Sequence, residues 1–490
     1  MKMKKYIYMA VAAIAVLSSC TSDNEVAGNL TPKGGEATFT ATIEAGSTRT
    51  TLGTGDDAGK VFWEVNDAIC VNGVNLTTTG PTGENHTQAT FTSSGSVTAN
   101  ETSPSYKAYY PADLYSGSTA TLPALQTYDA TTNGISNLPM YAESNDHNLV
   151  FKILCCVLKI TVNSSDFSEV SSINVYSNTW MNGEFTVDAS NNYSMSFSGD
   201  IADANKKVTL SMGTTPVSIT TSQVFYIAIP AGTHNLIIKV NGNSTSKVMA
   251  TKAAAGINVE RNTIYPITFA ENAIRLWANG PYWATVNVGA TITDYDQLDA
   301  TAEADNRYGS TTTNYTTANV GGLYCWGGKT FRNFRVGTYS ASQGSDNDYY
   351  ISSSIGNIAN TERDIAKSLW GVNWCMPTKD DLNNLISSTK CTWSSSSITK
   401  GTTGNTIICR SVSGKNSYSS NVIFLPIAGF VSSGTIENVA TYGRYWSSTP
   451  KSSSDAYYLS FTKNSQSIES QNGSPSRGYT VRAVLNVTNL

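Results

Sequence analysis

The fold class is decided by residues 149–162, which read LVFKILCCVLKITV. This stretch begins as a continuous apolar run and then alternates, so that Leu158, Ile160 and Val162 face one way while Lys159 and Thr161 face the other. A period of two is typical of a strand with one face on a core. We therefore predict one strand that leaves a sandwich core for a half-exposed surface.

Short alternating runs separated by Gly, Asn, Ser and Pro continue on both sides, from about Glu36 to Phe269, and we find no convincing helix among them. Asn72-Gly73 supplies the two positive-φ residues of a type I′ turn and predicts a tight hairpin. Residues 224–230 and 236–240 read as further buried strands. The whole region is therefore predicted to be all-β.

Several short motifs in this region resemble those of fimbrillin-like proteins, the pilus subunits and related surface lipoproteins of certain Gram-negative bacteria. They stand in the family's order between about residues 36 and 270: Thr48-Arg49-Thr50, Trp63-x-x-x-Asp67, Tyr106-x-Ala108-Tyr109-Tyr110-Pro111, Leu122-Pro123-Ala124-x-Gln126, Phe151-Lys152, Phe225-Tyr226-x-x-Ile229-Pro230-Ala231-Gly232 and Asn262-x-x-Tyr265-Pro266-Ile267.

The fimbrillin-like resemblance implies two consecutive transthyretin-like β-sandwiches, at 36–146 and 147–270. In polymerising members, a trypsin-like cut after an arginine removes the first strand and opens a groove for a neighbour's donor strand, held by main-chain hydrogen bonds. Arg49 is the candidate cut site here, with a solvated strand-end arginine as the alternative. The expected partners are other pilus subunits.

The sequence changes character after Phe269, where the first helix signals appear. Thr361 starts a predicted helix that presents Ile365, Ala366, Leu369 and Trp370 on one face and ends at Gly371. A second predicted helix begins at Thr378, with Leu382, Leu385 and Ile386 on one face. The paired acids Asp380 and Asp381 suit the first turn of that helix better than catalysis, because the helix dipole favours acids there.

Around these helices, a second set of motifs resembles the fibrobacter-type major paralogous (FISUMP) domain, which is similar to C-type lectin-like modules. The set is Trp283-Ala284-Thr285-x-Asn287-Val288-Gly289, Tyr324-Cys325-Trp326-Gly327, Trp374-Cys375-Met376-Pro377, Tyr445-Trp446-Ser447 and Tyr479-x-Val481-Arg482. The resemblance implies an α+β domain over 271–490 that acts as an adhesive or ligand-binding head. The expected fold is thus mainly β, two sandwiches followed by this α+β unit.

The cysteines leave their pairing open. Cys325 and Cys375 stand where the FISUMP-like family commonly has a small residue and Arg, which permits a bridge between them. Cys391 and Cys409 can pair with each other or stay reduced, since four cysteines allow three connectivities. No C-x-x-C or nearby His pair is present, so we expect no zinc site.

The N-terminus reads as a lipoprotein signal peptide over 1–19. Three lysines precede an apolar stretch from Tyr6 to Leu17, which is too short for a permanent span, and Leu17-Ser18-Ser19-Cys20 matches the lipobox whose Cys receives lipid. An ordinary signal peptide is the alternative. Residues 20–35 are polar and suit a flexible tether. Lipidation of Cys20 would place the chain on the outer membrane and at the cell surface, or on a fimbrium.

Composition narrows the function further. The 490 residues carry only 14% charged side chains and a net charge of −4, without a basic run, so nucleic acid is not an expected partner. We expect no cofactor and no metal. The acidic residues of the loop at 294–305 suit a solvated insertion more than a calcium site: Asp294, Asp296, Asp299, Glu303 and Asp305.

No catalytic motif appears, and the three histidines all lie in the fimbrillin-like part. We therefore expect a non-enzymatic, lipid-anchored surface protein, a fimbrial tip or accessory subunit whose C-terminal domain binds a surface glycan or protein. A stand-alone glycan-binding lipoprotein that never polymerises is the alternative, and a carbohydrate-active enzyme ranks third.

Overall fold

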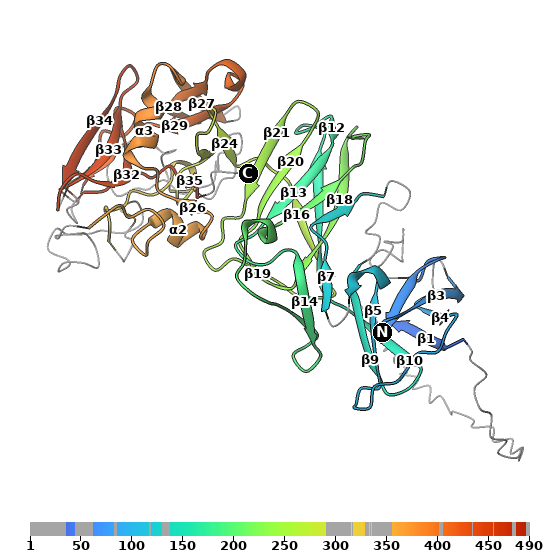
Figure 1. Cartoon of the computed structure of the whole chain (residues 1–490). Helices are drawn as coiled ribbons and strands as arrows, with labels where there is room; N and C mark the ends of the chain where they lie inside the picture. Colours follow the sequence, from blue (N-terminus) through green and yellow to red (C-terminus); the bar gives the residue numbers. More distant parts are fainter. Residues whose placement is uncertain are drawn as a thin grey trace, which may run out of the picture.

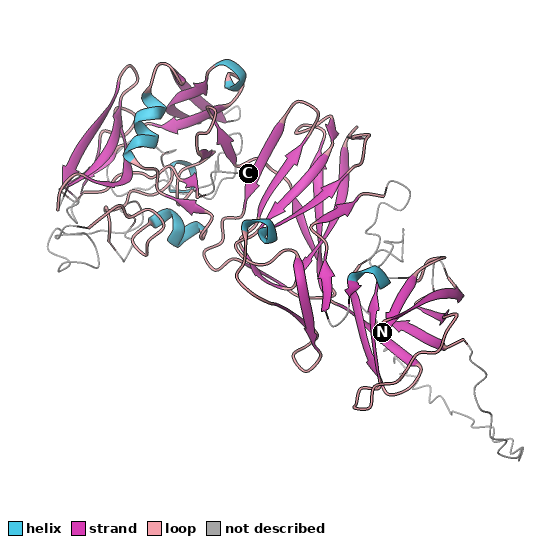
Figure 2. Cartoon of the chain, in the orientation of Figure 1, coloured by secondary structure: helices cyan, strands magenta, loops and turns pink. Residues whose placement is uncertain are grey.

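The structure is a computed structural model of the chain. It describes residues 36–44, 62–82, 86–116, 119–129, 138–290, 315, 317–328, 333, 335, 355–400, 405–433, 435–453, 455–472 and 477–486. The fold is mainly β, as predicted, and the described elements form three units in an elongated row (Figures 1 and 2). We call them the barrel, the middle sandwich and the C-terminal unit.

The barrel contains seven strands in the closed order β1-β10-β9-β5-β2-β3-β4. Aromatic and aliphatic side chains that alternate along these strands fill its centre. Asn72 and Gly73 have positive φ values of 47° and 84° and join β2 to β3, which confirms the predicted hairpin. The strands are β1 (Thr38–Ile43), β2 (Ala68–Val71), β3 (Val74–Gly80), β4 (Gln88–Thr92), β5 (Tyr106–Tyr110), β9 (Met140–Ser144) and β10 (Asn148–Ile153).

The stretch at 149–162 is two strands in two units rather than the single strand that we predicted. β10 ends at Ile153 in the barrel, and β11 (Cys155–Asn163) begins two residues later in the middle sandwich. The alternation in β11 is as expected, with Leu158, Ile160 and Val162 buried. The continuous apolar run reflects burial in two successive cores, which a local pattern cannot separate from one.

The middle sandwich packs the sheet β18-β11-β23 against the sheet that contains β13, β16, β20 and β21, and their inward residues form one core. Its strands are β11, β12 (Glu169–Val170), β13 (Ser172–Tyr176), β14 (Gly183–Asp188), β15 (Ser194–Phe197), β16 (Lys207–Ser211), β17 (Val217–Ser218), β18 (Ser222–Pro230), β19 (Gly232–His234), β20 (Ile237–Asn241), β21 (Ser246–Ala250), β22 (Ile257–Val259) and β23 (Ile264–Thr268), with a 3-10 turn η3 (Asp203–Lys206).

Strand pairing does not follow the expected division at 146/147. β9 and β10 lie on either side of that position and pair with each other in the barrel. Conversely, the segment after η2 (Ala112–Leu114) crosses to the middle sandwich: β7 (Thr119–Leu122) pairs with β14, and β8 (Leu125–Thr127) pairs in parallel with β16. β6 (Tyr115–Ser116) pairs with β7. These crossings tie the two units together.

One sheet also runs from the middle sandwich into the C-terminal unit, in the order β26-β35-β25-β24-β21-β20-β13-β16-β8. The strands that carry it into the C-terminal unit are β24 (Ala273–Arg275), β25 (Tyr282–Ala284), β26 (Trp374–Cys375) and β35 (Val484–Leu485). Two three-stranded sheets and a two-stranded one complete this unit: β27 (Cys391–Lys400), β28 (Asn405–Gly414) and β29 (Val422–Pro426); β32 (Gly443–Pro450), β33 (Asp455–Phe461) and β34 (Gln466–Asn472); and β30 (Phe430–Ser432) with β31 (Thr435–Glu437).

The C-terminal unit also holds α1 (Thr317–Val320), α2 (Ile365–Trp370), α3 (Lys379–Ile386) and η6 (Asn416–Tyr418). α3 begins at Thr378 with a capping box, and Asp381 accepts hydrogen bonds from Thr378 N (2.8 Å) and Oγ1 (2.7 Å). This confirms the capping role of Asp381. α2 ends at Gly371 as predicted, but its N-cap is Asp364 rather than Thr361, and Leu369 is 40% exposed although we expected it on the buried face.

None of the described helices is long and apolar enough to cross a membrane.

Candidate functional site

The candidate site is β1, the first described strand, which closes the barrel. It pairs in parallel with β10, with Ile43 opposite Phe151, and antiparallel with β4, with Thr42 opposite Gln88. In Figure 1, β1 lies among the blue strands beside β4 and β10. Both edges of β1 are therefore used, and the strand joins the two sides of the barrel.

The inward face of β1 is fully buried. Phe39, Ala41 and Ile43 are 0%, 0% and 4% exposed, while the intervening threonines face outward. The ring of Phe39 lies 4.3 Å from that of His147 between centroids, and Trp63 Nε1 donates to the carbonyl oxygen of Ala41 at 3.0 Å. The alternation TFTATI thus fits an amphipathic strand over an aromatic core.

Glu44, directly after β1, belongs to a charge cluster where the barrel meets the middle sandwich. Its carboxylate binds the guanidinium of Arg261 through both Nη atoms and lies 3.4 Å from Lys152 Nζ. Arg261 stands in the turn between β22 and β23, 217 residues away in sequence. The pair therefore joins the end of β1 to the neighbouring unit.

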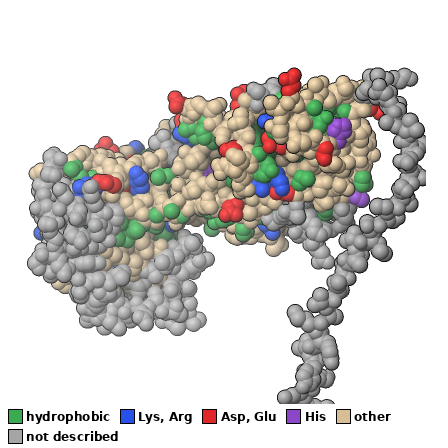
Figure 3. Space-filling model, turned by 90° about the horizontal axis from the view of Figure 1, so that it is seen from below, with side chains coloured by type: hydrophobic (Ala, Val, Ile, Leu, Met, Phe, Trp, Pro, Cys, Tyr) green, Lys and Arg blue, Asp and Glu red, His purple; other side chains and the backbone are tan. Residues whose placement is uncertain are grey.

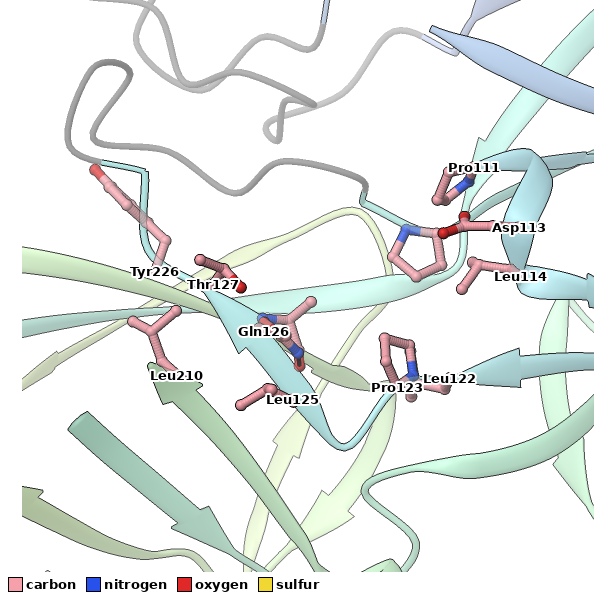
Figure 4. A pocket seen from close by; sticks show the side chains of 12 residues that line it. Pro111, Asp113, Leu114, Leu122, Pro123, Leu125, Gln126, Thr127, Leu210 and Tyr226 are labelled. Carbon is pink, nitrogen blue, oxygen red and sulfur yellow. Dashed lines mark hydrogen bonds between the residues drawn. The ribbon is translucent and has the colours of Figure 1, made fainter. Parts of the chain in front are cut away.

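A small cavity of about 300 Å³ lies at the same junction (Figure 4). Its wall combines barrel residues such as Pro111 and Leu114 with Leu210 and Tyr226 of the middle sandwich. Gln126 is fixed there by two hydrogen bonds with the backbone of Ala228, to the carbonyl oxygen (2.8 Å) and from the amide nitrogen (2.9 Å). Gln126 therefore joins β8 to β18, which lie in the two facing sheets of the middle sandwich.

A larger cleft of about 990 Å³ separates parts of the middle sandwich and the C-terminal unit, and many of its lining side chains are polar. Lys252 lies in its wall, with its Nζ 4.2 Å from the centroid of the Trp370 ring and 5.7 Å from that of Trp374. Burial, with a smaller effect of the nearby Arg482 charge, lowers the pKa of Lys252 to about 7. The two ring faces thus contact the Lys252 amine where burial disfavours its charged form.

The C-terminal strand β35 is held on both edges. Val484 pairs with Trp283 of β25 and with Cys375 of β26, and Leu485 pairs with Trp374. β35 therefore lies inside the sheet that joins the C-terminal unit to the middle sandwich.

Several residues singled out in the sequence lie outside the described part of the chain. They are Cys20, Arg49 and the acidic loop at 294–305. Within the described residues, no group of three or more His, Cys, Asp or Glu side chains is placed to hold a metal ion.

The seven cysteines in the described part of the chain are buried and free. Cys375 packs with Cys391 in one hydrophobic cluster, and Cys325 packs with Leu323 and Val431 in another. A bridge between Cys325 and Cys375 stays a prediction. A bridge between Cys391 and Cys409 does not fit: Cys391 faces Gly414 and Cys409 faces Ser396, five residues apart along the hairpin. That offset is about 17 Å, beyond the reach of a disulfide.

Sequence reasoning missed Glu44, Arg261, Lys152 and Lys252 as functional candidates. Glu44 stands at the end of an alternating run, where a charge usually means the strand has reached solvent. Only the pairing of distant segments shows that an arginine meets it. An acid after a strand and an arginine in a turn carry no local signal of contact.

Charged side chains are sparse on the face of the molecule drawn in Figure 3. Figure 3 shows one face on which acidic and basic side chains are scattered among uncharged polar atoms.

Comparisons with known proteins add a partial match. A family model described as a domain of unknown function (DUF8237) matches residues 398–484, within the C-terminal unit. No curated protein matches the chain.

Solved structures give weak likenesses. A candidate cell adhesion protein from Bacteroides ovatus is 12% identical, with a TM-score of 0.28, and the match covers 48% of this chain and 93% of that one. A fimbrial protein from the same species is 10% identical, with a TM-score of 0.22 and coverage of 92% and 99%. The tip fimbrial protein Mfa3 from Porphyromonas gingivalis is 11% identical, with a TM-score of 0.21 and coverage of 48% and 96%. These TM-scores are all below 0.3.

Proposed function

We propose that the chain is a cell-surface subunit of fimbrial type, in which β1 gives way to a strand from a neighbouring subunit. The observation that carries the proposal is the place of β1 between β10 and β4, with Phe39, Ala41 and Ile43 pointing into the core. Arg49 follows Ile43 by six residues, so a cut after Arg49 would detach β1 from the rest of the chain. The loss of β1 would leave an apolar groove with two unpaired edges.

Lipidation of Cys20 is the proposed anchor, on the outer membrane and facing outward. A cut after Arg49 would also separate the folded part of the chain from that anchor. The same cleavage would thus release the subunit from the membrane and open its groove.

We further propose a tip or accessory position, with the C-terminal unit as the adhesive end. A shaft subunit must both accept a strand and donate one. β35 is paired with β25 and β26, so this strand is not free to serve as a donor. A subunit that accepts only would stand at one end of a polymer. We propose no enzymatic activity.

Mass spectrometry on the chain recovered from cell surfaces tests the cleavage. A chain that begins at Thr50 is the expected product, and a chain still joined to lipidated Cys20 would count against assembly by strand removal. Immunogold labelling with antibody to the C-terminal unit tests the position: label at one end of a fimbrium is expected, and label along its whole length would refute a tip role.

The cleft beside Lys252 favours a second candidate function, a glycan-binding lipoprotein that never polymerises. The cleft wall includes the hydroxyl groups of Ser396 and Ser397, which are suited to hydrogen bonds with a sugar. A glycan array probed with the full chain would test it, with Ser396→Val as the matched variant. Saturable binding by an uncleaved chain that the variant loses would favour this candidate.

A further inference from the structure

The charge cluster at Glu44 is shielded from water. The side chains of Glu44 and Arg261 are only 10% and 14% exposed, and that of Lys152 is 27% exposed. Besides its contacts with both cations, the Glu44 carboxylate accepts a hydrogen bond from the backbone nitrogen of Ile153 at 2.8 Å. One carboxylate thus balances two cations at the end of β1.

The two cations are held in place by other contacts as well. Arg261 Nη1 donates to the carbonyl oxygen of Ile153 (3.0 Å) and Arg261 Nε to that of Asn192 (3.0 Å). The Tyr193 ring centroid lies 5.5 Å from Arg261 Cζ and 5.8 Å from Lys152 Nζ. None of these contacts comes from β1 or Glu44.

Within the described ranges, Glu44 is the only carboxylate that forms an ion pair with either cation. Departure of β1 would therefore leave a preformed, positively charged socket at one end of the groove. A buried cation that loses its partner is strongly unfavourable, so the empty socket favours a new carboxylate.

We infer that the strand which replaces β1 carries an acidic side chain at the position of Glu44, where Arg261 and Lys152 bind it. This inference rests on the proposed function and names the chemistry of the partner. The sites of Phe39, Ala41 and Ile43 set the other residue types of the incoming strand. It carries an aromatic, a small and a branched aliphatic residue at these three sites, with any residue between them, and the acidic residue comes directly after. The strand runs parallel to β10.

Contacts in the groove explain the residue type expected at each position of the incoming strand. The aromatic site is framed by the rings of His147 and Tyr106, at 4.3 and 5.0 Å between centroids. The small site lies beside Trp63, which fills the barrel centre against Phe91 and Phe151.

The acidic residue would fix the register of the incoming strand. A slip of two residues keeps the same face inward but moves the carboxylate by about 7 Å, beyond hydrogen-bonding reach of Arg261. The socket thus selects one alignment among those that the apolar pattern allows.

Strand replacement in the cleaved protein tests the inference. The full chain is cut after Arg49 by an arginine-specific protease, and the cut is verified by mass. Two labelled peptides are then offered in excess, one with the sequence of residues 36–44, EATFTATIE, and one with Gln in place of the final Glu. Incorporation and dissociation rates are measured by fluorescence anisotropy.

We expect the Glu peptide to bind at least about tenfold more tightly than the Gln peptide. The Glu carboxylate accepts charge-assisted hydrogen bonds and neutralises a buried cation, whereas the Gln amide carries no charge. The preference should shrink to about twofold or less in a chain that carries Arg261→Gln. Since the two peptides are compared on the unmodified chain, the test holds even if that variant folds poorly, and Lys152→Gln provides a second one.

The outcomes separate the two proposals. Equal binding of both peptides would overturn the carboxylate socket while leaving strand acceptance intact. Failure of both peptides to replace β1 would overturn strand acceptance itself, and the socket with it. A preference that persists in both Arg261→Gln and Lys152→Gln would show that these cations are not its source.

Discussion

Asn287 and Arg482, 195 residues apart in sequence, meet in the core of the C-terminal unit, where Arg482 Nε donates to Asn287 Oδ1 at 2.8 Å. Arg482 is 1% exposed, and its other nitrogens donate to the carbonyl oxygens of Ala284, Thr285 and Phe424 at 2.7–2.8 Å. Two of the FISUMP-like motifs thus converge on one guanidinium, which joins the segment after β25, strand β29 and the C-terminal segment.

Replacing Arg482 should therefore destabilise the C-terminal unit. We expect Arg482→Met to lower its free energy of unfolding by at least about 3 kcal/mol, because four acceptors, two of them fully buried, lose their donor. Urea unfolding followed by tryptophan fluorescence measures the change. Arg363→Met is the matched control, since the Arg363 side chain is only partly buried and donates to Gly327 O. A loss at Arg482 no larger than in that control would contradict this role.

The C-terminal unit should be rigidly joined to the middle sandwich at Gly371. This glycine has a φ of +91°, and a Cβ there would lie 2.5 Å from Ala253 O and 2.6 Å from Asn235 Oδ1. We expect Gly371→Ala to loosen the junction and to broaden the distance distribution in small-angle scattering. Gly356→Ala is the control, because nothing lies within 4 Å of its Cβ position. An unchanged scattering profile for Gly371→Ala would show that the junction does not depend on this contact.

The stability of the middle sandwich should fall in mild acid because of His234. Burial lowers the pKa of this imidazole, which is 2% exposed and bonds Ser177 Oγ (2.9 Å) and Pro230 O (2.9 Å). Below about pH 6.5 the unfolded chain binds a proton that the folded imidazole resists, so stability falls as the pH falls through this range.

The free energy of unfolding, measured by urea denaturation between pH 7.5 and 5, checks this. Its decline with falling pH should be smaller in His234→Gln than in the unmodified chain, by up to about 1.4 kcal/mol per pH unit. His86→Gln, in the barrel, should keep the full decline. Identical slopes in the unmodified chain and His234→Gln would remove His234 as the cause.

A covalent lock on β1 should block assembly. Gln88 Nε2 donates to Thr42 Oγ1 at 3.1 Å, so the two side chains meet on the outer face of the barrel. We expect the double variant Thr42→Cys, Gln88→Cys to form a disulfide, to accept the cut after Arg49 and still to retain β1. Reduction should restore strand release. Assembly of the oxidised, locked chain into fimbriae would argue against β1 as the exchanged strand.

The local parts of the fold could be read from the sequence. Asn72-Gly73 specifies its turn, Thr378 and Asp381 specify a helix start, and the alternation of Leu158 and Ile160 specifies a buried strand face. Each of these signals depends on neighbours within a few residues, where chain geometry fixes which side chains meet.

The long-range pairings of the fold could not be predicted from the sequence. The parallel pairing of β1 with β10 joins segments about a hundred residues apart, and β8 pairs with β16 across a unit boundary. The contact of Glu44 with Arg261 depends on the first of these pairings, which brings Glu44 beside Ile153, where Arg261 also binds. A local pattern states that a strand has a buried face, but not which strand lies beside it.

The central claim is that a neighbour's strand takes the place of β1, and the chain recovered from assembled fimbriae tests it most directly. Native fimbriae are cross-linked, digested and analysed by mass spectrometry. We predict a chain that begins at Thr50, with residues of β4 or β10 cross-linked to a segment of another subunit. A chain in assembled fimbriae that still carries residues 38–43, cross-linked to its own β4 and β10, would contradict it.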